Sequence, residues 1–179
     1  MSKEAGLLKT LVTSIFDLNE EWAKLRGEKS TQKLRPPATT AQIAKLQKTL
    51  GVTLPGDYLE MLRLHNGWED FRADYSLLSV DEMLENGPIK KTVTELKKIQ
   101  QSNPQTADHD GIIFLASRVG GSFCVYFDRS TLKVDTSMEV VQWDPGGVIR
   151  RHPSFTAYLE SYKGVQERAV ERERKRLRA

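Results

Sequence analysis

The chain has 179 residues, of which 39% are hydrophobic and 28% are charged. This length suits one domain that buries on the order of 70% of its unfolded surface, so stability requires no disulfide or metal. The single cysteine, Cys124, excludes an intramolecular disulfide, and its place in an alternating apolar run is typical of a buried side chain. No secretory signal and no apolar run of membrane-spanning length is recognisable. These features predict a soluble, cytoplasmic protein without a membrane partner.

The net charge of +3 is distributed unevenly along the chain. Residues 163–179 carry seven basic side chains against three glutamates, whereas residues 68–85 carry six acidic side chains against one arginine. Because opposite charges gather in different segments, the charge of the whole chain says little about the partners that it binds.

A first helix is predicted near the N-terminus, because apolar residues recur there at helical spacing. These residues are Leu7, Leu8, Leu11, Val12, Ile15, Phe16, Trp22 and Leu25. Residues 27–37 read as a linker that follows this helix.

Two further helices are predicted to form a tight helical hairpin. Thr39 and Gln42 have the spacing of a capping box at the start of the first helix. Gly51 supplies its left-handed end, and Pro55 begins the second helix. Gly67, which follows an asparagine, ends the second helix.

The middle of the chain is predicted to form a short strand followed by two helices. Residues 75–78 are predicted to form a strand, and Ser79 with Glu82 forms a second capping box that begins a helix. Residues 93–99 have helical spacing, and this helix ends before Pro104 because the residue before proline disfavours helical dihedrals.

The remaining strands and the last helix follow in order. Residues 112–116, 123–127, 138–143 and 148–150 are rich in apolar and β-branched residues, and pairs of glycines mark the turns between the first two and between the last two of these segments. Ser154 begins a last helix. The predicted fold is therefore of the α+β class, with a helical hairpin and flanking helices packed on an antiparallel sheet of four or five strands.

Two sets of residues lie at fixed spacing along the chain. Those of the first set are Arg35, Pro36, Pro37, Ala38, Thr39, Thr40, Ile43, Leu46, Leu50, Gly51, Val52, Leu54, Pro55, Asp57, Tyr58, Leu62, His65, Asn66 and Gly67. Those of the second set are Gly120, Gly121, Val125–Asp128, Val140–Asp144, Ser154, Phe155 and Tyr158–Glu160. In both sets the chain resembles the Smi/Knr-type domains of the SUKH superfamily. The resemblance divides the chain into an N-terminal helical extension (1–33), a SUKH-like domain (34–162) and a basic C-terminal helical tail (163–179).

The sequence contains no recognisable arrangement of catalytic or metal-binding residues. The three histidines are far apart in the chain and none forms a ligand pair at helical spacing. The best local cluster, residues 108–110 (Asp-His-Asp), is interpreted as a solvated loop, with a metal or acid–base site as the alternative. Residues 130–133 match a Ser-x-x-Lys pattern but fall between strands, where that pattern does not function. We therefore predict no catalytic, cofactor-binding or metal-binding residues.

The candidate partner-binding residues are Trp68, Glu69, Asp70, Phe71 and Asp74. Two aromatic side chains flank two carboxylates just after the predicted end of a helix, where an exposed loop is expected. Aromatic anchors beside carboxylates suit an interface with a basic protein. In the alternative interpretation, both rings belong to the core and the acidic side chains only face water.

The basic segment from Arg168 to Arg178 is the one hint of a nucleic-acid partner, because clustered cations neutralise phosphates. Glutamates at helical spacing dilute its charge, and it contains no aromatic residue that could stack on bases. An exposed helix of mixed charge is therefore the favoured interpretation.

The resemblance implies a function without catalysis. Bacterial members of the superfamily are largely immunity proteins that neutralise toxins, whereas fungal relatives regulate cell-wall synthesis and signalling. We expect a protein-binding module that needs no cofactor, namely a bacterial immunity protein that binds a cognate toxin directly. The alternative is an intracellular regulatory or scaffold protein of the Smi/Knr type.

Overall fold

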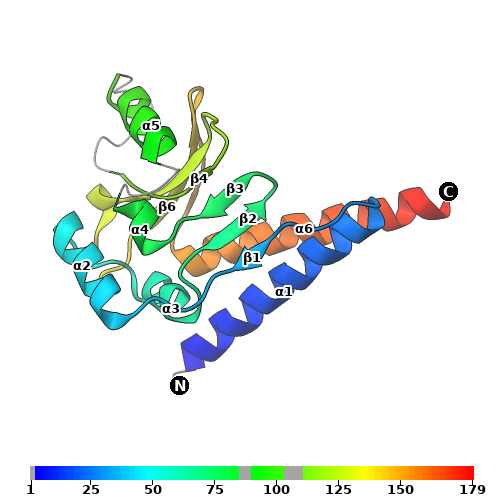
Figure 1. Cartoon of the computed structure of the whole chain (residues 1–179), viewed down its shortest axis with the longest axis horizontal. Helices are drawn as coiled ribbons and strands as arrows, with labels where there is room; N and C mark the ends of the chain where they lie inside the picture. The colour runs from blue at the N-terminus through cyan, green and yellow to red at the C-terminus, as the bar shows by residue number, and fades with distance from the viewer. Residues whose placement is uncertain (1–2, 85–89, 103–110) are drawn as a thin grey trace.

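The computed structural model describes residues 3–84, 90–102 and 111–179. This part of the chain forms six α-helices, one short 3-10 helix and a sheet of seven antiparallel strands (Figure 1). The predicted α+β class is confirmed. The predicted number of strands, four or five, is wrong, because two strands near the N-terminal half were not foreseen.

The described residues form fourteen elements. In chain order they are α1 (Lys3–Leu25), β1 (Lys33–Leu34), α2 (Thr40–Leu50), α3 (Gly56–Leu64), β2 (Trp68–Arg72), β3 (Tyr75–Leu77), α4 (Val80–Met83), α5 (Lys90–Ser102), β4 (Ile112–Ser117), β5 (Cys124–Asp128), η1 (Arg129–Thr131), β6 (Glu139–Asp144), β7 (Gly147–His152) and α6 (Phe155–Arg178).

The sheet is a meander in which every strand pairs with its neighbours in the sequence, in the order β1 to β7. In such an arrangement the β2–β3, β4–β5 and β6–β7 turns all lie at one end of the sheet, and the other connections lie at the opposite end. Strands β1 and β7 form the two edges. The missed strands are β1, which has two residues inside the predicted linker, and β2, whose irregular register with β3 hides the alternation of a strand.

The two predicted capping boxes and the left-handed helix end at Gly51 are confirmed. Thr39 accepts a hydrogen bond from the amide of Gln42, whose side chain accepts one from the amide of Thr39. Gly51 ends α2 in the left-handed region, with φ of 66°. The second capping box, formed by Ser79 and Glu82, begins α4. These short-range hydrogen bonds satisfy amides that a helix start otherwise leaves free.

The core is centred on aromatic side chains that join the helical hairpin, the sheet and the last helix. The ring of Tyr58 in α3 lies 5.4 Å from that of Phe114 in β4 and 5.0 Å from those of Phe127 and Phe155, measured between centroids. All four residues are buried. Edge-to-face contacts of this kind add to the free energy gained by burial.

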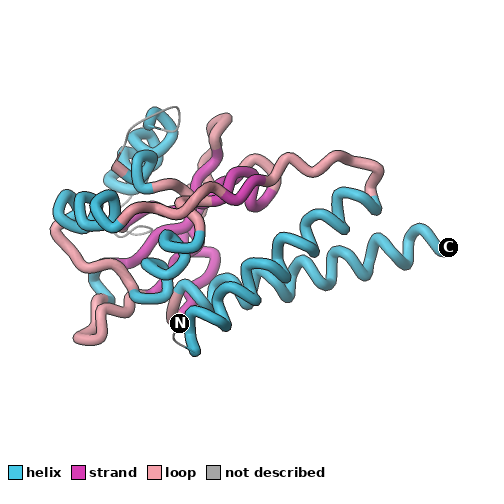
Figure 2. Tube along the Cα trace, turned by 60° about the horizontal axis from the view of Figure 1, so that its bottom comes forward, coloured by secondary structure: helices cyan, strands magenta, loops and turns pink. Residues whose placement is uncertain are grey.

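Helices α1 and α6 lie side by side, run in the same direction and project beyond the sheet (Figures 1 and 2). We call this pair the two-helix arm. Near its free end, Arg174 Nε donates a hydrogen bond to Glu21 Oε1 at 2.8 Å. Helix α6 runs unbroken across the predicted boundary between residues 162 and 163, so the basic segment continues the helix that begins in the core.

His152 gives the fold a pH dependence. Burial lowers the pKa of His152 below its usual value of 6.5, and the nearby positive charge of Arg150 lowers it further. The unfolded chain therefore binds a proton at a pH where the folded chain does not. Stability is complete above pH 6.5 and declines as the pH falls from there toward the folded-state pKa. We expect the midpoint of thermal unfolding to fall less between pH 7 and pH 5 in His152→Gln than in the wild type.

The matched variant Arg150→Gln removes only the smaller of the two causes. Its melting midpoint is expected to depend on pH with a slope between those of the wild type and His152→Gln. Parallel curves for all three proteins would show that His152 does not couple protonation to folding.

Candidate partner-binding surface

The two predicted aromatic anchors lie in the core rather than on an exposed loop. Trp68 and Phe71 belong to strand β2, and both side chains are 0% exposed. Residues three apart in a regular strand point to opposite faces of the sheet, but the register shifts between Trp68 and Arg72. This irregularity lets both rings enter the core, where their centroids lie 5.0 Å apart.

These two rings hold the two-helix arm against the sheet. Phe16 of α1 stacks on Trp68 with a centroid distance of 5.9 Å, and Tyr162 of α6 lies 4.3 Å from Phe71. Their contacts are therefore made within the chain, as the alternative interpretation of the sequence expects. The surface that a partner meets must be sought in the side chains around them.

Glu69 belongs to an ion-pair network rather than to an open acidic surface. Arg35 Nε lies 3.0 Å from Glu69 Oε1, and Arg118 Nη1 lies 3.0 Å from Glu69 Oε2. Arg35 also binds Glu82 through two hydrogen bonds of 2.6 and 2.9 Å. We call these four residues the Arg35 network. It neutralises two of the six carboxylates that the sequence places in residues 68–85.

The pKa values of the two glutamates reflect this pairing. Burial raises the pKa of Glu69, but hydrogen bonds from Arg35 and Arg118 outweigh it and hold that pKa below the usual range. Burial also raises the pKa of Glu82, but hydrogen bonds from Arg35 and Ser79 outweigh it and hold that pKa low. Both carboxylates therefore remain charged near neutral pH and are compensated locally.

Of the five predicted site residues, Glu69, Asp70 and Asp74 keep part of their side chains accessible, and Asp70 and Asp74 lie outside the Arg35 network. Asp70 has a φ of 50°, in the left-handed region, and its amide donates a hydrogen bond to Ser76 Oγ at 3.1 Å. Asp74 Oδ2 accepts a hydrogen bond of 2.6 Å from Ser117 Oγ. Aspartate tolerates the left-handed region better than most residues, so the bend at Asp70 is compatible with its side chain.

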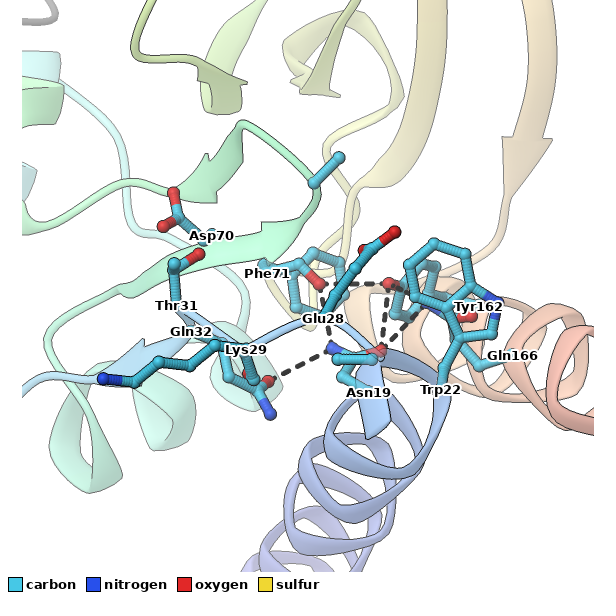
Figure 3. Close-up of a pocket in the computed structure, with 13 residues that line it drawn as sticks. Asn19, Trp22, Glu28, Lys29, Thr31, Gln32, Asp70, Phe71, Tyr162 and Gln166 are labelled. Atoms are coloured by element: carbon cyan, nitrogen blue, oxygen red, sulfur yellow. Dashed lines mark hydrogen bonds between the residues drawn. The ribbon is translucent and has the colours of Figure 1, made fainter. Parts of the chain in front are cut away.

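Asp70 and Phe71 also line a cavity of about 130 Å³ between the arm and the sheet (Figure 3). Asn19 lies at its centre, where its amide nitrogen donates to the Phe71 carbonyl at 3.0 Å and its amide oxygen accepts from Gln166 at 2.9 Å. Tyr162 donates to the same Phe71 carbonyl at 3.0 Å. This volume is below that of usual ligand pockets, and these polar groups already bind one another. The cavity therefore joins the arm to β2.

An aromatic and cationic patch that the sequence analysis missed lies at the hairpin end of the sheet. The guanidinium of Arg72 lies 5.3 Å from the centroid of the Phe123 ring, and Tyr75 meets that ring edge to face at 5.3 Å. Tyr75 and Phe123 are half-buried, and Val119, on the same β4–β5 turn as Phe123, is 81% exposed. We call Arg72, Tyr75, Val119 and Phe123 the hairpin-tip patch.

The signal for this patch is present in the sequence but distributed. Arg72 and Tyr75 flank one turn, and Phe123 lies almost 50 residues later, so only the pairing of β3 with β4 and of β4 with β5 brings them together. Asp70 and Asp74 border the patch along the chain. Arginine and tyrosine are enriched among the residues that contribute most to protein interfaces.

The described residues contain few groupings of side chains that suit a metal-binding or catalytic site. Within them, no group of three or more His, Cys, Asp or Glu side chains is arranged to hold a metal ion. The cluster at residues 108–110 lies outside the described residues. Ser130 is in the short helix η1, where its hydroxyl donates to Asp128 Oδ1. Among the helices of the described ranges, none is long and apolar enough to cross a membrane.

Comparisons with known proteins agree with the expected resemblance. The chain is 35% identical over 63 residues to the uncharacterized protein YnaB of Bacillus subtilis (strain 168), a stretch that covers 35% of this chain and 43% of that protein. A family model for the SMI1/KNR4 family (SUKH-1) matches residues 37–161, from the start of the helical hairpin into α6. The chain therefore belongs to the SMI1/KNR4 family (SUKH-1).

Proposed function

We propose that this protein is an immunity protein that neutralises a cognate toxin by direct binding, without catalysis. Membership of the SMI1/KNR4 family (SUKH-1) is the observation that carries the proposal. The hairpin-tip patch supports it, because that patch offers partly exposed aromatic and cationic side chains on neighbouring strands of a continuous sheet. Side chains held on paired strands lose little conformational entropy when a partner binds.

The partner-binding surface in this proposal combines the hairpin-tip patch with Asp70 and Asp74. The patch supplies the apolar and aromatic contact area, and the two aspartates at its border attract a basic partner. Trp68 and Phe71 act indirectly, because their burial fixes the position of β2. Glu69 acts indirectly as well, through its ion pair with Arg118 on the β4–β5 turn.

A toxicity rescue assay tests the function itself. The chain is coexpressed with each candidate toxin domain encoded beside it, and growth is compared with that of cells that carry the toxin alone. Recovery of growth together with a stoichiometric complex supports the proposal. Growth inhibition that persists with every such toxin, despite abundant folded protein, contradicts it.

The hairpin-tip patch predicts which variants lose binding. Arg72→Glu and Val119→Asp change exposed side chains, and each is expected to weaken the complex with the neutralised toxin by about tenfold or more, because an interface anchor contributes at least 1–2 kcal/mol. The dissociation constant is measured by titration calorimetry. Arg168→Glu, which makes the same charge change on the exposed surface of α6, is the control and should bind as the wild type does. If both patch variants bind the toxin with wild-type affinity, the toxin binds a surface other than the hairpin-tip patch.

A regulatory or scaffold role is the second candidate, and the two-helix arm favours it. Helix α1 and the part of α6 that follows residue 161 lie outside the residues that match the family, and the two helices project beyond the sheet (Figure 2). Such an arm provides a docking element that toxin binding does not require. Recovery of the same cellular proteins with the chain from toxin-free cells, and their loss when residues 163–179 are removed, would favour this role.

A further inference from the structure

A second concave surface lies at the end of the sheet opposite the hairpin-tip patch. It has a volume of about 610 Å³, and the start of α1, the start of α3, the segment that joins β5 to β6 and the start of α6 surround it. The β5–β6 connection and the end of β7 lie at the end of the sheet away from the β2–β3 and β4–β5 turns. We call this concave surface the α1–α3 groove.

The floor and rim of the groove are apolar. Leu8 and Met138 are 2% and 1% exposed and form part of the floor. Leu7 is 57% exposed at the rim, and Leu59 is half-buried beside it. Val134, fully exposed, lies on the same β5–β6 segment as the lining residues. Apolar side chains exposed around a concave apolar floor are typical of a surface that another protein covers.

The wall of the groove is acidic. Its ionised side chains are the carboxylates of Asp57, Glu60 and Asp135, against the one guanidinium of Arg63, which pairs with Glu60. Asp135 Oδ1 accepts two hydrogen bonds from Ser137, and within the described residues no ion pair to Asp135 is formed. Asp57 Oδ2 accepts hydrogen bonds from the amide and hydroxyl of Thr156. The lining therefore carries an excess of negative charge beside its apolar floor.

Part of the groove is supplied by a segment outside the family match. Leu7 and Leu8 belong to α1, whereas the other lining residues lie within the matched residues 37–161. Helix α1 packs against α3 (Figure 1), and its residues Leu7 and Leu8 line one side of the groove. Without α1, the groove would lose its Leu7 rim.

We infer that the α1–α3 groove binds a cationic amphipathic segment of a partner protein. An amphipathic helix places apolar side chains at positions i, i+3, i+4 and i+7 into such a groove, while lysines or arginines on its flank meet the carboxylates. The apolar floor accounts for the apolar face of this segment, and the acidic wall accounts for its charge. The inference goes beyond the proposed function, because it requires neither a toxin nor the hairpin-tip patch.

Two designed peptides test the occupant directly. The first has about 14 residues, with leucines at the spacing given above and lysines on the other face, and the second has glutamate at every lysine position. Each carries a fluorophore, and binding to the full chain is followed by fluorescence anisotropy. The lysine peptide is expected to bind, with an affinity that falls as the salt concentration rises. The glutamate peptide is expected not to bind. Equal binding of the two peptides, or no binding of the lysine peptide, overturns the inference.

Matched variants locate the binding. Leu7→Lys and Asp135→Lys change exposed groove residues. Each is expected to lower the affinity for the lysine peptide by at least about tenfold. Ile149→Lys and Asp81→Lys introduce the same side chain at exposed positions outside the groove and should leave the affinity unchanged. Thermal unfolding shows whether each variant is folded. If Leu7→Lys does not fold, Asp135→Lys in its exposed segment decides alone, and unchanged affinity in that variant rejects the groove.

The results separate this inference from the proposed function. A chain that binds the lysine peptide in the groove but neutralises no toxin retains the inference and loses the proposed function. A chain that neutralises a toxin with unchanged efficiency, yet binds neither peptide, retains the function and loses the inference.

Discussion

Replacing Arg35 with methionine is expected to destabilise the protein by about 3–5 kcal/mol, the usual loss when one partner of a buried ion pair is removed. Arg35 binds Glu82 through two hydrogen bonds and Glu69 through one. Glu82 is only 5% exposed, so the variant leaves a charged carboxylate without its cation in the protein interior. The free energy of unfolding from urea titrations measures the loss.

Two comparisons separate this effect from a general loss of charge. Arg26→Met removes an exposed partner of Glu28 and is expected to cost less than about 1 kcal/mol. Adding Glu82→Gln to Arg35→Met removes the uncompensated charge and should restore part of the stability. A loss below 1 kcal/mol in Arg35→Met would mean that water compensates Glu82 and that the network contributes little.

Gly67→Ala is expected to destabilise the protein by roughly 3–5 kcal/mol, from backbone strain and overpacking together. Gly67 has a φ of 92°, which a residue with a Cβ rarely adopts. A Cβ there would lie 2.7 Å from the Leu77 carbonyl oxygen and 2.8 Å from the Ser79 amide nitrogen. Both neighbours are backbone atoms of the segment from β3 to α4, so neither can rotate away.

Gly51→Ala is the matched control for this variant. Gly51 also has a positive φ, of 66°, but a Cβ at that position would meet no atom within 4 Å. Its replacement is expected to cost only about 1 kcal/mol. Comparable urea midpoints for the two variants would show that the contact with residues 77–79 is relieved by a shift of the backbone.

Local sequence patterns predicted the elements that depend on short-range interactions. The capping box of Thr39 and Gln42 and the left-handed end at Gly51 each involve residues within a few positions of one another. The strands β4 to β7 were predicted because they are rich in apolar and β-branched residues and because glycine pairs mark the β4–β5 and β6–β7 turns. These features depend on nearby residues in the sequence and not on contacts with distant segments.

The features that were missed depend on contacts between distant segments. Gly67 was interpreted only as the end of a helix, whereas its larger role is a close approach to the chain ten residues later. Strand β2 was taken for a loop because its bulge breaks the alternation, and Trp68 with Phe71 then resembled exposed anchors. The hairpin-tip patch could not be predicted without the order of the strands in the sheet, because its residues come from distant parts of the sequence.

The pairing of α1 with α6 has a consequence for synthesis of the chain. Every strand pairs with a neighbour in the sequence, so the sheet can assemble while translation continues. Helix α1 leaves the ribosome before the strands of the sheet, whereas its companion α6 is made after them. During that interval Leu8, Leu11, Val12 and Ile15 lack much of their eventual cover. The nascent protein should therefore be most prone to aggregate, or to engage a chaperone, in the interval before α6 emerges.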